Sequence, residues 1–134
     1  MANFTGSYIL DKSEGFEEYL IARGISAEKA KAGAAAATQM DIEHSGDQMK
    51  IRVCAGDTEI SNLTHTIGKQ LDVPRPDGQV MKTTLTLDGK KAVMEQIDGK
   101  GVKEVIVRDL QADGSIVATM TSNGVTATRR FKKK

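Results

Sequence analysis

The stretch VMKTTLTLDGKKAVMEQIDGK, residues 80–100, contains two strand-length segments, each followed by an Asp-Gly pair. Asx-Gly pairs supply the positive φ angles that tight hairpin turns need. Such pairs recur through the second half of the chain, at positions 77–78, 88–89, 98–99, 113–114 and 123–124. The segments between them are rich in Val, Ile and Thr, which favour strands. This half of the chain is therefore predicted to be a run of antiparallel hairpins.

Residues 16–38, FEEYLIARGISAEKAKAGAAAAT, follow a different pattern. Four of their side chains share one face of a helix: Phe16, Tyr19, Leu20 and Arg23. Gly24 is placed to end this helix, and Ser26 is a natural N-cap for a second one. The predicted order is one strand, a helix pair at about residues 16–37, and then only strands, about ten strands in all.

A long antiparallel meander must protect its edge strands, and closure into a barrel removes them. About ten strands enclose more space than side chains fill, because about eight already leave room for one small ligand. Aromatic residues make up only 4% of the chain, which hardly suggests a densely filled interior. The expected fold is all-β: one domain, residues 1–134, forming a ten-stranded up-and-down barrel (a β-clam) with a two-helix lid after the first strand and an internal cavity.

Composition and residue spacing argue against several classes of function. The formal net charge is +1, so no strong field argues for a nucleic-acid partner. No stretch approaches the ~18 apolar residues of a membrane span, which predicts a cytoplasmic (or also nuclear) protein. We also expect a monomer. One cysteine and two histidines without ligand spacing predict no disulfide, no metal and no cofactor, and both histidines are expected to be solvated or structural. No Ser/His/Asp order or carboxylate dyad indicates an enzyme.

Two arginines interrupt apolar faces of the predicted strands. In GVTATRRFKKK, residues 124–134, Arg129 lies on the same face as Ala127 and Phe131. In KEVIVRDL, residues 103–110, Arg108 shares a face with Ile106. A buried guanidinium without a partner costs several kcal/mol. A ligand carboxylate would suit both arginines, because the guanidinium fork can hold both oxygens.

The sequence also allows explanations of the two arginines that involve no ligand. They could form internal ion pairs, lie near a barrel mouth, or reflect a wrong strand phase. Glu104 points inward by the same alternation as Arg108 and could pair with an arginine. A fatty acid nevertheless fits the energetics, because burying ~16 carbons offers on the order of 13 kcal/mol before losses.

The segment GSYILDKSEGFEEYL, residues 6–20, resembles the N-terminal signature of the intracellular lipid-binding, or fatty-acid-binding, protein family. The resemblance continues through the helix pair, an SGD hairpin, TLDGKK, IVRDL and the terminal TRRFKKK. Members of that family are ten-stranded clams, closed by two helices, that carry long-chain fatty acids, retinoids or related lipids through the cytoplasm. The resemblance therefore implies a non-enzymatic carrier of a long-chain fatty acid.

The resemblance also implies the site residues. Arg108 and Arg129 match the carboxylate-binding arginines, and Phe131 matches a position that is phenylalanine in the intestinal type. Arg108 would then carry more of the head-group contact. The other positions expected to contact ligand are Met94, Gln96, Ile106, Phe16 and Tyr19. Transient membrane contact through the basic helix pair is a further expectation.

Some features depart from the family pattern or leave alternatives. Residues 54–68 fit poorly, carry an extra residue and lack the phenylalanine expected at the portal turn. Retinoic acid or a bile-acid-like acid is the alternative ligand. A lipid-acting enzyme and a structural barrel with no ligand are the competing functions from other classes.

Overall fold

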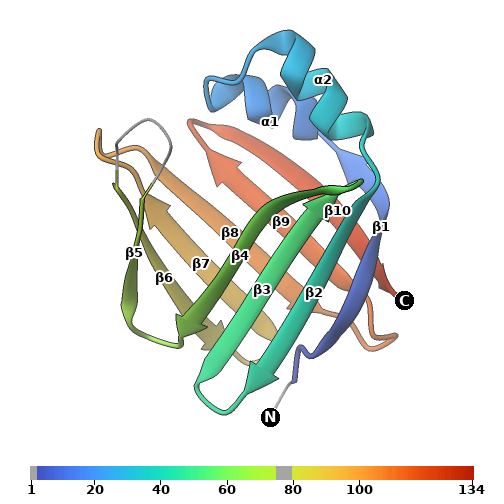
Figure 1. Ribbon diagram of the computed structural model, residues 1–134, viewed down its shortest axis with the longest axis vertical. Helices are drawn as coiled ribbons and strands as arrows, with labels where there is room; N and C mark the ends of the chain where they lie inside the picture. Colours follow the sequence, from blue (N-terminus) through green and yellow to red (C-terminus); the bar gives the residue numbers. More distant parts are fainter. Residues whose placement is uncertain (1–2, 75–79) are drawn as a thin grey trace.

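The computed structural model describes residues 3–74 and 80–134 of the protein. Ten strands and two helices form in the predicted order (Figure 1). The elements are β1 (Gly6–Glu14), α1 (Phe16–Ala22), α2 (Ala27–Ala35), β2 (Thr38–Ser45), β3 (Gln48–Ala55), β4 (Thr58–Thr66), β5 (Gln70–Pro74), β6 (Val80–Asp88), β7 (Lys91–Ile97), β8 (Lys103–Leu110), β9 (Ile116–Ser122) and β10 (Val125–Lys133). The expected turn at Asp77-Gly78 lies outside the described residues.

The strands form one antiparallel sheet that curls into a nearly closed barrel. Its order is β4-β3-β2-β1-β10-β9-β8-β7-β6-β5, so β1 pairs with both β2 and β10. The sheet of described residues ends at β4 and β5, which do not pair with each other. The backbone N–H of Gly68, just before β5, donates to the Leu85 carbonyl of β6 at 2.7 Å and extends the pairing of these two strands. This arrangement confirms the predicted barrel, with the difference that its two end strands do not pair along their length in the described part of the chain.

In the described chain, the Asx-Gly pairs at residues 88–89 and 123–124 form tight hairpin turns, whereas those at 98–99 and 113–114 lie in longer connections. Gly89 and Gly124 have φ angles of 60° and 77°, which glycine adopts without steric cost. At residues 98–102 the positive φ instead falls on Gly101, and the Asp98 carboxylate accepts hydrogen bonds from the backbone of Lys100 and Val102. This connection is longer than the predicted two-residue turn because the aspartate side chain organises it.

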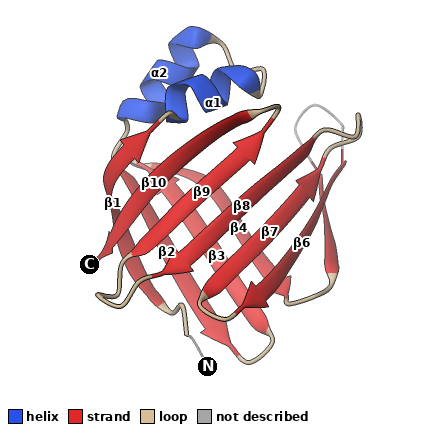
Figure 2. Cartoon of the chain, turned by 180° about the vertical axis from the view of Figure 1, so that it is seen from behind, coloured by secondary structure: helices blue, strands red, loops and turns tan. Residues whose placement is uncertain are grey.

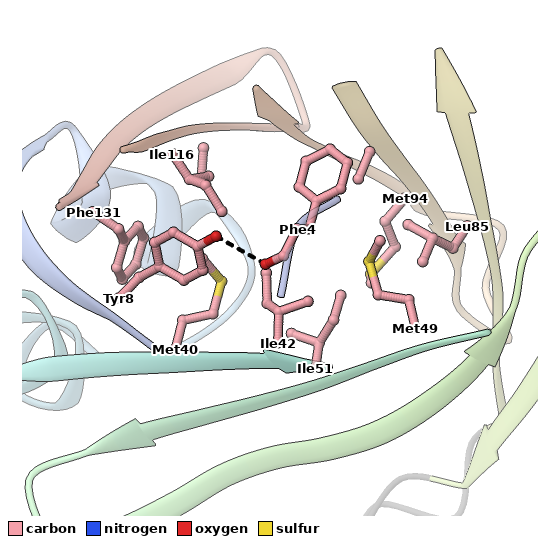
Figure 3. Close-up of a cluster of buried hydrophobic side chains, with 12 residues drawn as sticks. Phe4, Tyr8, Met40, Ile42, Met49, Ile51, Leu85, Met94, Ile116 and Phe131 are labelled. Carbon is pink, nitrogen blue, oxygen red and sulfur yellow. Dashed lines mark hydrogen bonds between the residues drawn. The ribbon is translucent and has the colours of Figure 1, made fainter. Parts of the chain in front are cut away.

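Apolar side chains fill one part of the barrel interior. They come from both walls and include Phe4, Tyr8, Met40, Ile42, Met49, Ile51, Leu85, Met94, Ile116 and Phe131 (Figure 3). The Tyr8 hydroxyl donates to the Phe4 carbonyl at 2.8 Å, which fixes the segment before β1 against this cluster. The segment that leads into β1, from residue 3 onward, lies at the end of the barrel away from the helices (Figure 1).

The helix pair covers the other end of the barrel (Figures 1 and 2). Tyr19 of α1 packs on Met120 and Ala127 of β9 and β10, which ties the first helix to the sheet. Helix α2 contacts α1 closely, since a Cβ at Gly33 would lie 3.2 Å from Leu20 Cδ1. The Ser26 hydroxyl caps α2 by accepting from the Lys29 N–H, as predicted.

Candidate ligand-binding site

Strand pairing aligns the two interior arginines. Arg108 of β8 and Arg129 of β10 lie opposite the same residue, Ala118 of the intervening strand β9 (Figure 2). Side chains of directly paired residues point to the same face, and adjacent strands lie about 4.8 Å apart, so the two Cα atoms are separated by about 10 Å. Two arginine side chains can reach one small anion across that distance.

Arg108 is buried, and its guanidinium group lacks hydrogen-bond partners in the described chain for some of its donors. Its side chain is 8% exposed, and both Nε and Nη1 lack a hydrogen-bond partner among the described residues. Burial lowers the pKa of Arg108 to about 10, against an opposing effect of the Glu104 charge. The guanidinium therefore stays protonated at neutral pH and keeps two unused donors.

Arg129 is held in place but is also incompletely satisfied. Its Nε donates to the Ser13 hydroxyl at 3.3 Å, and its guanidinium carbon lies 3.8 Å from the centroid of the Phe16 ring. A cation over an aromatic face is attracted by the ring quadrupole. Burial lowers the pKa of Arg129 to about 10, and Nη2 has no partner in the part of the chain that the structure describes. Arg129 thus remains charged and oriented, with one donor free.

The inward acid, Glu104, is neutralised by the lid rather than by these arginines. Its carboxylate accepts hydrogen bonds from the Tyr19 hydroxyl and from Gln96 Nε2, the latter at 2.7 Å. It also forms an ion pair with Arg23 at the end of α1, at 3.5 Å. Burial, followed by the Glu104 hydrogen bond, raises the pKa of Tyr19, so the phenol donates its proton to this bond at neutral pH.

These contacts decide between the alternatives that the sequence left open. Glu104 does pair with an arginine, but the partner is Arg23. No ion pair joins Arg108 or Arg129 to an acidic side chain within residues 3–74 and 80–134. The internal positive charge is therefore not cancelled by the described chain.

Three adjoining cavities surround these groups. One, of about 430 Å³, extends from β4 to β8 and is lined in part by His65, Gln96 and Arg108. A second, of about 230 Å³, lies under α1 and contains both interior arginines in its wall. The third, of about 400 Å³, lies between the helices and β3–β4, and is mostly apolar apart from Arg129, Lys29 and Thr38. Shared lining residues connect the three.

All eight residues expected to contact ligand line one or more of these cavities. They are Phe16, Tyr19, Met94, Gln96, Ile106, Arg108, Arg129 and Phe131. The structure brings the two arginines, both lid residues, Ile106 and Phe131 together around the second cavity, and places Met94 and Gln96 on the first. Their role in binding remains a prediction.

His65 is a cavity residue that the sequence reasoning missed. A solvated or structural histidine was expected. His65 is not solvated, because it is 1% exposed, and neither ring nitrogen has a hydrogen-bond partner in the described structure. Burial, together with the nearby charge of Arg108, lowers its pKa. The available signal was the alternation of Leu63, His65 and Ile67, which places the imidazole on an apolar face.

The poorly matching segment, residues 54–68, contains a β-bulge. Val53 pairs with Ser61 but Cys54 pairs with Glu59, so Ile60 has no partner on β3. Ile60 is 61% exposed and lines all three cavities, so this part of the wall borders both the cavities and the solvent.

Searches for metal clusters and membrane-spanning helices are negative for the described residues. No group of three or more His, Cys, Asp or Glu side chains is placed to hold a metal ion there. Within the same residues, no helix has the length and apolar character to cross a bilayer.

Comparisons with known proteins agree with this architecture. The whole chain, residues 1–134, matches the lipocalin / cytosolic fatty-acid binding protein family. It is 30% identical over 132 residues to sodium/calcium exchanger regulatory protein 1 of Doryteuthis pealeii, covering 98% of this chain and 97% of the relative. It is also 30% identical over 139 residues to cellular retinoic acid-binding protein 2 of Mus musculus, covering 100% of both. The solved structure of a Schistosoma mansoni fatty acid binding protein in complex with arachidonic acid gives a TM-score of 0.87 at 25% identity, covering 100% of this chain and 98% of that one.

The ion pair between Arg23 and Glu104 is expected to stabilise the closed lid. Their side chains are only 15% and 10% exposed. Arg23→Met should therefore lower the free energy of unfolding by about 1–3 kcal/mol, because it leaves a mostly buried carboxylate without its cation. Hydrogen exchange in α1 should also become faster.

Arg130→Met is the matched control for that variant. The pair of Arg130 and Asp113 is shorter, at 2.9 Å, but its side chains are 45% and 59% exposed. Exposed pairs contribute about 0–1 kcal/mol, so this change should have the smaller effect in denaturant unfolding. Equal losses for the two variants would contradict a stabilising role for the lid contact.

The buried His65 should make stability fall in mild acid. The unfolded chain binds a proton near the ordinary histidine pKa of 6.5, whereas the folded pKa is lower. Stability from the neutral imidazole is thus fully present above about pH 6.5 and is lost as the pH falls, at up to about 1.4 kcal/mol per pH unit. In urea unfolding, the native chain should lose stability faster than His65→Leu as the pH falls below that value, and parallel curves would refute a depressed pKa.

Proposed function

The chain belongs to the lipocalin / cytosolic fatty-acid-binding protein family, and we propose that it carries a long-chain fatty acid whose carboxylate is held by Arg108 and Arg129. Members of this family are non-enzymatic binders, so the chain is a binding protein and not an enzyme. The cytosolic character in the family description supports a cytoplasmic carrier.

The observation that supports this ligand class is the unmatched positive charge inside the barrel. Arg108 and Arg129 flank Ala118 in one cross-strand row and keep unpartnered donors. An unpartnered buried charge is costly, and a ligand carboxylate would remove that cost while accepting charge-assisted hydrogen bonds. An alcohol, an ester or a hydrocarbon could not supply the opposite charge.

The apolar part of the site suits an alkyl tail. Phe16, Leu20 and Val53 line the cavity of about 400 Å³, whose wall also includes Arg129 and Ile60. We place the carboxylate at the arginines and the tail along this wall. Each buried CH₂ contributes about 0.8 kcal/mol, so the tail would provide most of the affinity and the arginines would select the head group.

Retinoic acid is the second candidate ligand. The full-length similarity to a cellular retinoic acid-binding protein favours it, and it also combines one carboxylate with an apolar body. Both acids would use the same arginines. Competition between hexadecanoic acid and retinoic acid for one fluorescent probe would rank the two, and a bile acid in the same assay would test a broader cavity.

Replacement of either arginine should weaken acids selectively. Arg108→Gln or Arg129→Gln removes a charge-assisted contact, which corresponds to about a 10- to 100-fold loss of affinity for hexadecanoic acid. Hexadecanol, which has the same tail without the charge, should change by no more than about three-fold. Isothermal titration or probe displacement measures both.

Arg130→Gln is the control, since this neighbouring side chain is exposed and pairs with Asp113 instead. It should leave both ligands unaffected. If the acid and the alcohol weaken equally in the Arg108 and Arg129 variants, the arginines do not hold the carboxylate. If no fatty acid binds at all, the carrier function itself is wrong.

A further inference from the structure

We propose that His65 forms a second polar subsite in the barrel, and that the preferred ligand is a hydroxylated long-chain acid whose chain hydroxyl binds the imidazole. This inference rests on the proposed function, because it assumes that a carboxylate occupies Arg108 and Arg129. It adds a chemical requirement on the ligand that the arginines do not impose.

His65 is buried without a hydrogen-bond partner in the described chain. The side chain is 1% exposed and lies in the wall of the cavity of about 430 Å³, yet neither Nδ1 nor Nε2 finds a hydrogen-bond partner in the described chain. The other histidine is different, since His44 Nδ1 accepts the backbone N–H of Phe4 at 3.3 Å. A buried polar group left unsatisfied is unusual in native proteins.

The cavity wall around His65 contains several polar side chains. The same cavity is lined by Ser61, Gln96, Glu104 and Arg108, whereas the cavity of about 400 Å³ is mostly apolar. Gln96 and Glu104 satisfy each other at 2.7 Å, and Thr83 donates to Gln96 at 3.2 Å. His65, like Arg108, therefore has buried polar atoms in this wall that find no hydrogen-bond partner in the described chain.

A ligand hydroxyl is the group that best matches the hydrogen-bonding capacity of His65. Burial and the nearby Arg108 charge lower the pKa of His65, so at neutral pH the ring is neutral and has one N–H donor and one acceptor nitrogen. A second carboxylate on the ligand could only accept. A hydroxyl can donate to one tautomer or accept from the other, and it adds no charge beside the arginines.

The position of the subsite is consistent with a single ligand. Arg108 lines both the cavity of about 430 Å³ and the cavity of about 230 Å³ under the lid. A carboxylate between the two arginines therefore lies next to the chamber that contains His65. One chain can occupy both places if its hydroxyl is carried on a carbon of the chain rather than on the head group.

The test compares hexadecanoic acid with a series of monohydroxyhexadecanoic acids whose hydroxyl moves along the chain. At least one isomer should bind the native protein about five-fold more tightly than hexadecanoic acid, which corresponds to one additional net hydrogen bond. His65→Leu should abolish that preference, which weakens the favoured isomer about five-fold relative to hexadecanoic acid. His65→Gln, which keeps a donor and an acceptor, should restore part of it.

Two further measurements keep the test decisive. His44→Gln, at the histidine outside the cavities, should leave the preference between the two ligands intact. In the unaltered protein, the ring ¹⁵N resonances of His65 should shift when the favoured isomer is added and much less with hexadecanoic acid. This readout does not depend on whether a variant folds.

The outcomes separate this inference from the proposed function. If hexadecanoic acid binds through the arginines but no isomer binds more tightly, or the preference persists in His65→Leu, the subsite is refuted and the carrier function stands. If the affinity for hexadecanoic acid is unchanged in the Arg108→Gln and Arg129→Gln variants, the proposed function is refuted, and the subsite proposal that rests on it is refuted as well. A His65 ring that does not respond to any isomer also overturns the subsite.

Discussion

The site is organised by two guanidinium groups that the barrel buries and leaves without an acidic partner in the described chain. Strand pairing places Arg108 and Arg129 on either side of Ala118, and the Phe16 ring and the Ser13 hydroxyl hold Arg129 in position. A barrel that closed around a dry apolar core would gain stability by replacing both residues. Their presence is understandable if the missing negative charge arrives with a ligand.

Glu104, an inward-pointing acid of this wall, contacts the lid instead. Tyr19 and Arg23 lie on one face of α1, and both contact its carboxylate, together with Gln96 of β7. The lid is thereby joined to β8 by charge as well as by apolar packing. This division leaves the positive charge of the deeper arginines available while the helix pair stays seated over the barrel.

Period-two and helical patterns in the sequence predicted much of this architecture. Individual residues show what such patterns cannot predict. Period-two alternation placed Arg108, Arg129 and Glu104 inside, and a helical face grouped Tyr19 with Arg23. The choice of Arg23 as the partner of Glu104 was out of reach, because it depends on how α1 sits over β8, which no local pattern encodes. His65 was missed for a related reason: its strand mixes polar residues on both faces, and the unpaired Ile60 shifts the alternation between the start and the end of β4. Cavity dimensions depend on side-chain packing across strands that are distant in sequence.

The central claim is that the buried arginines hold an ionised carboxylate, and NMR of bound [1-¹³C]hexadecanoic acid tests it most directly. A titration of the labelled carboxyl carbon gives the pKa of the acid inside the protein. Nearby cations lower a carboxyl pKa, whereas burial without a charged partner raises it. The account predicts a bound pKa clearly below the value of the same acid in water, and a pKa at or above that value would contradict it.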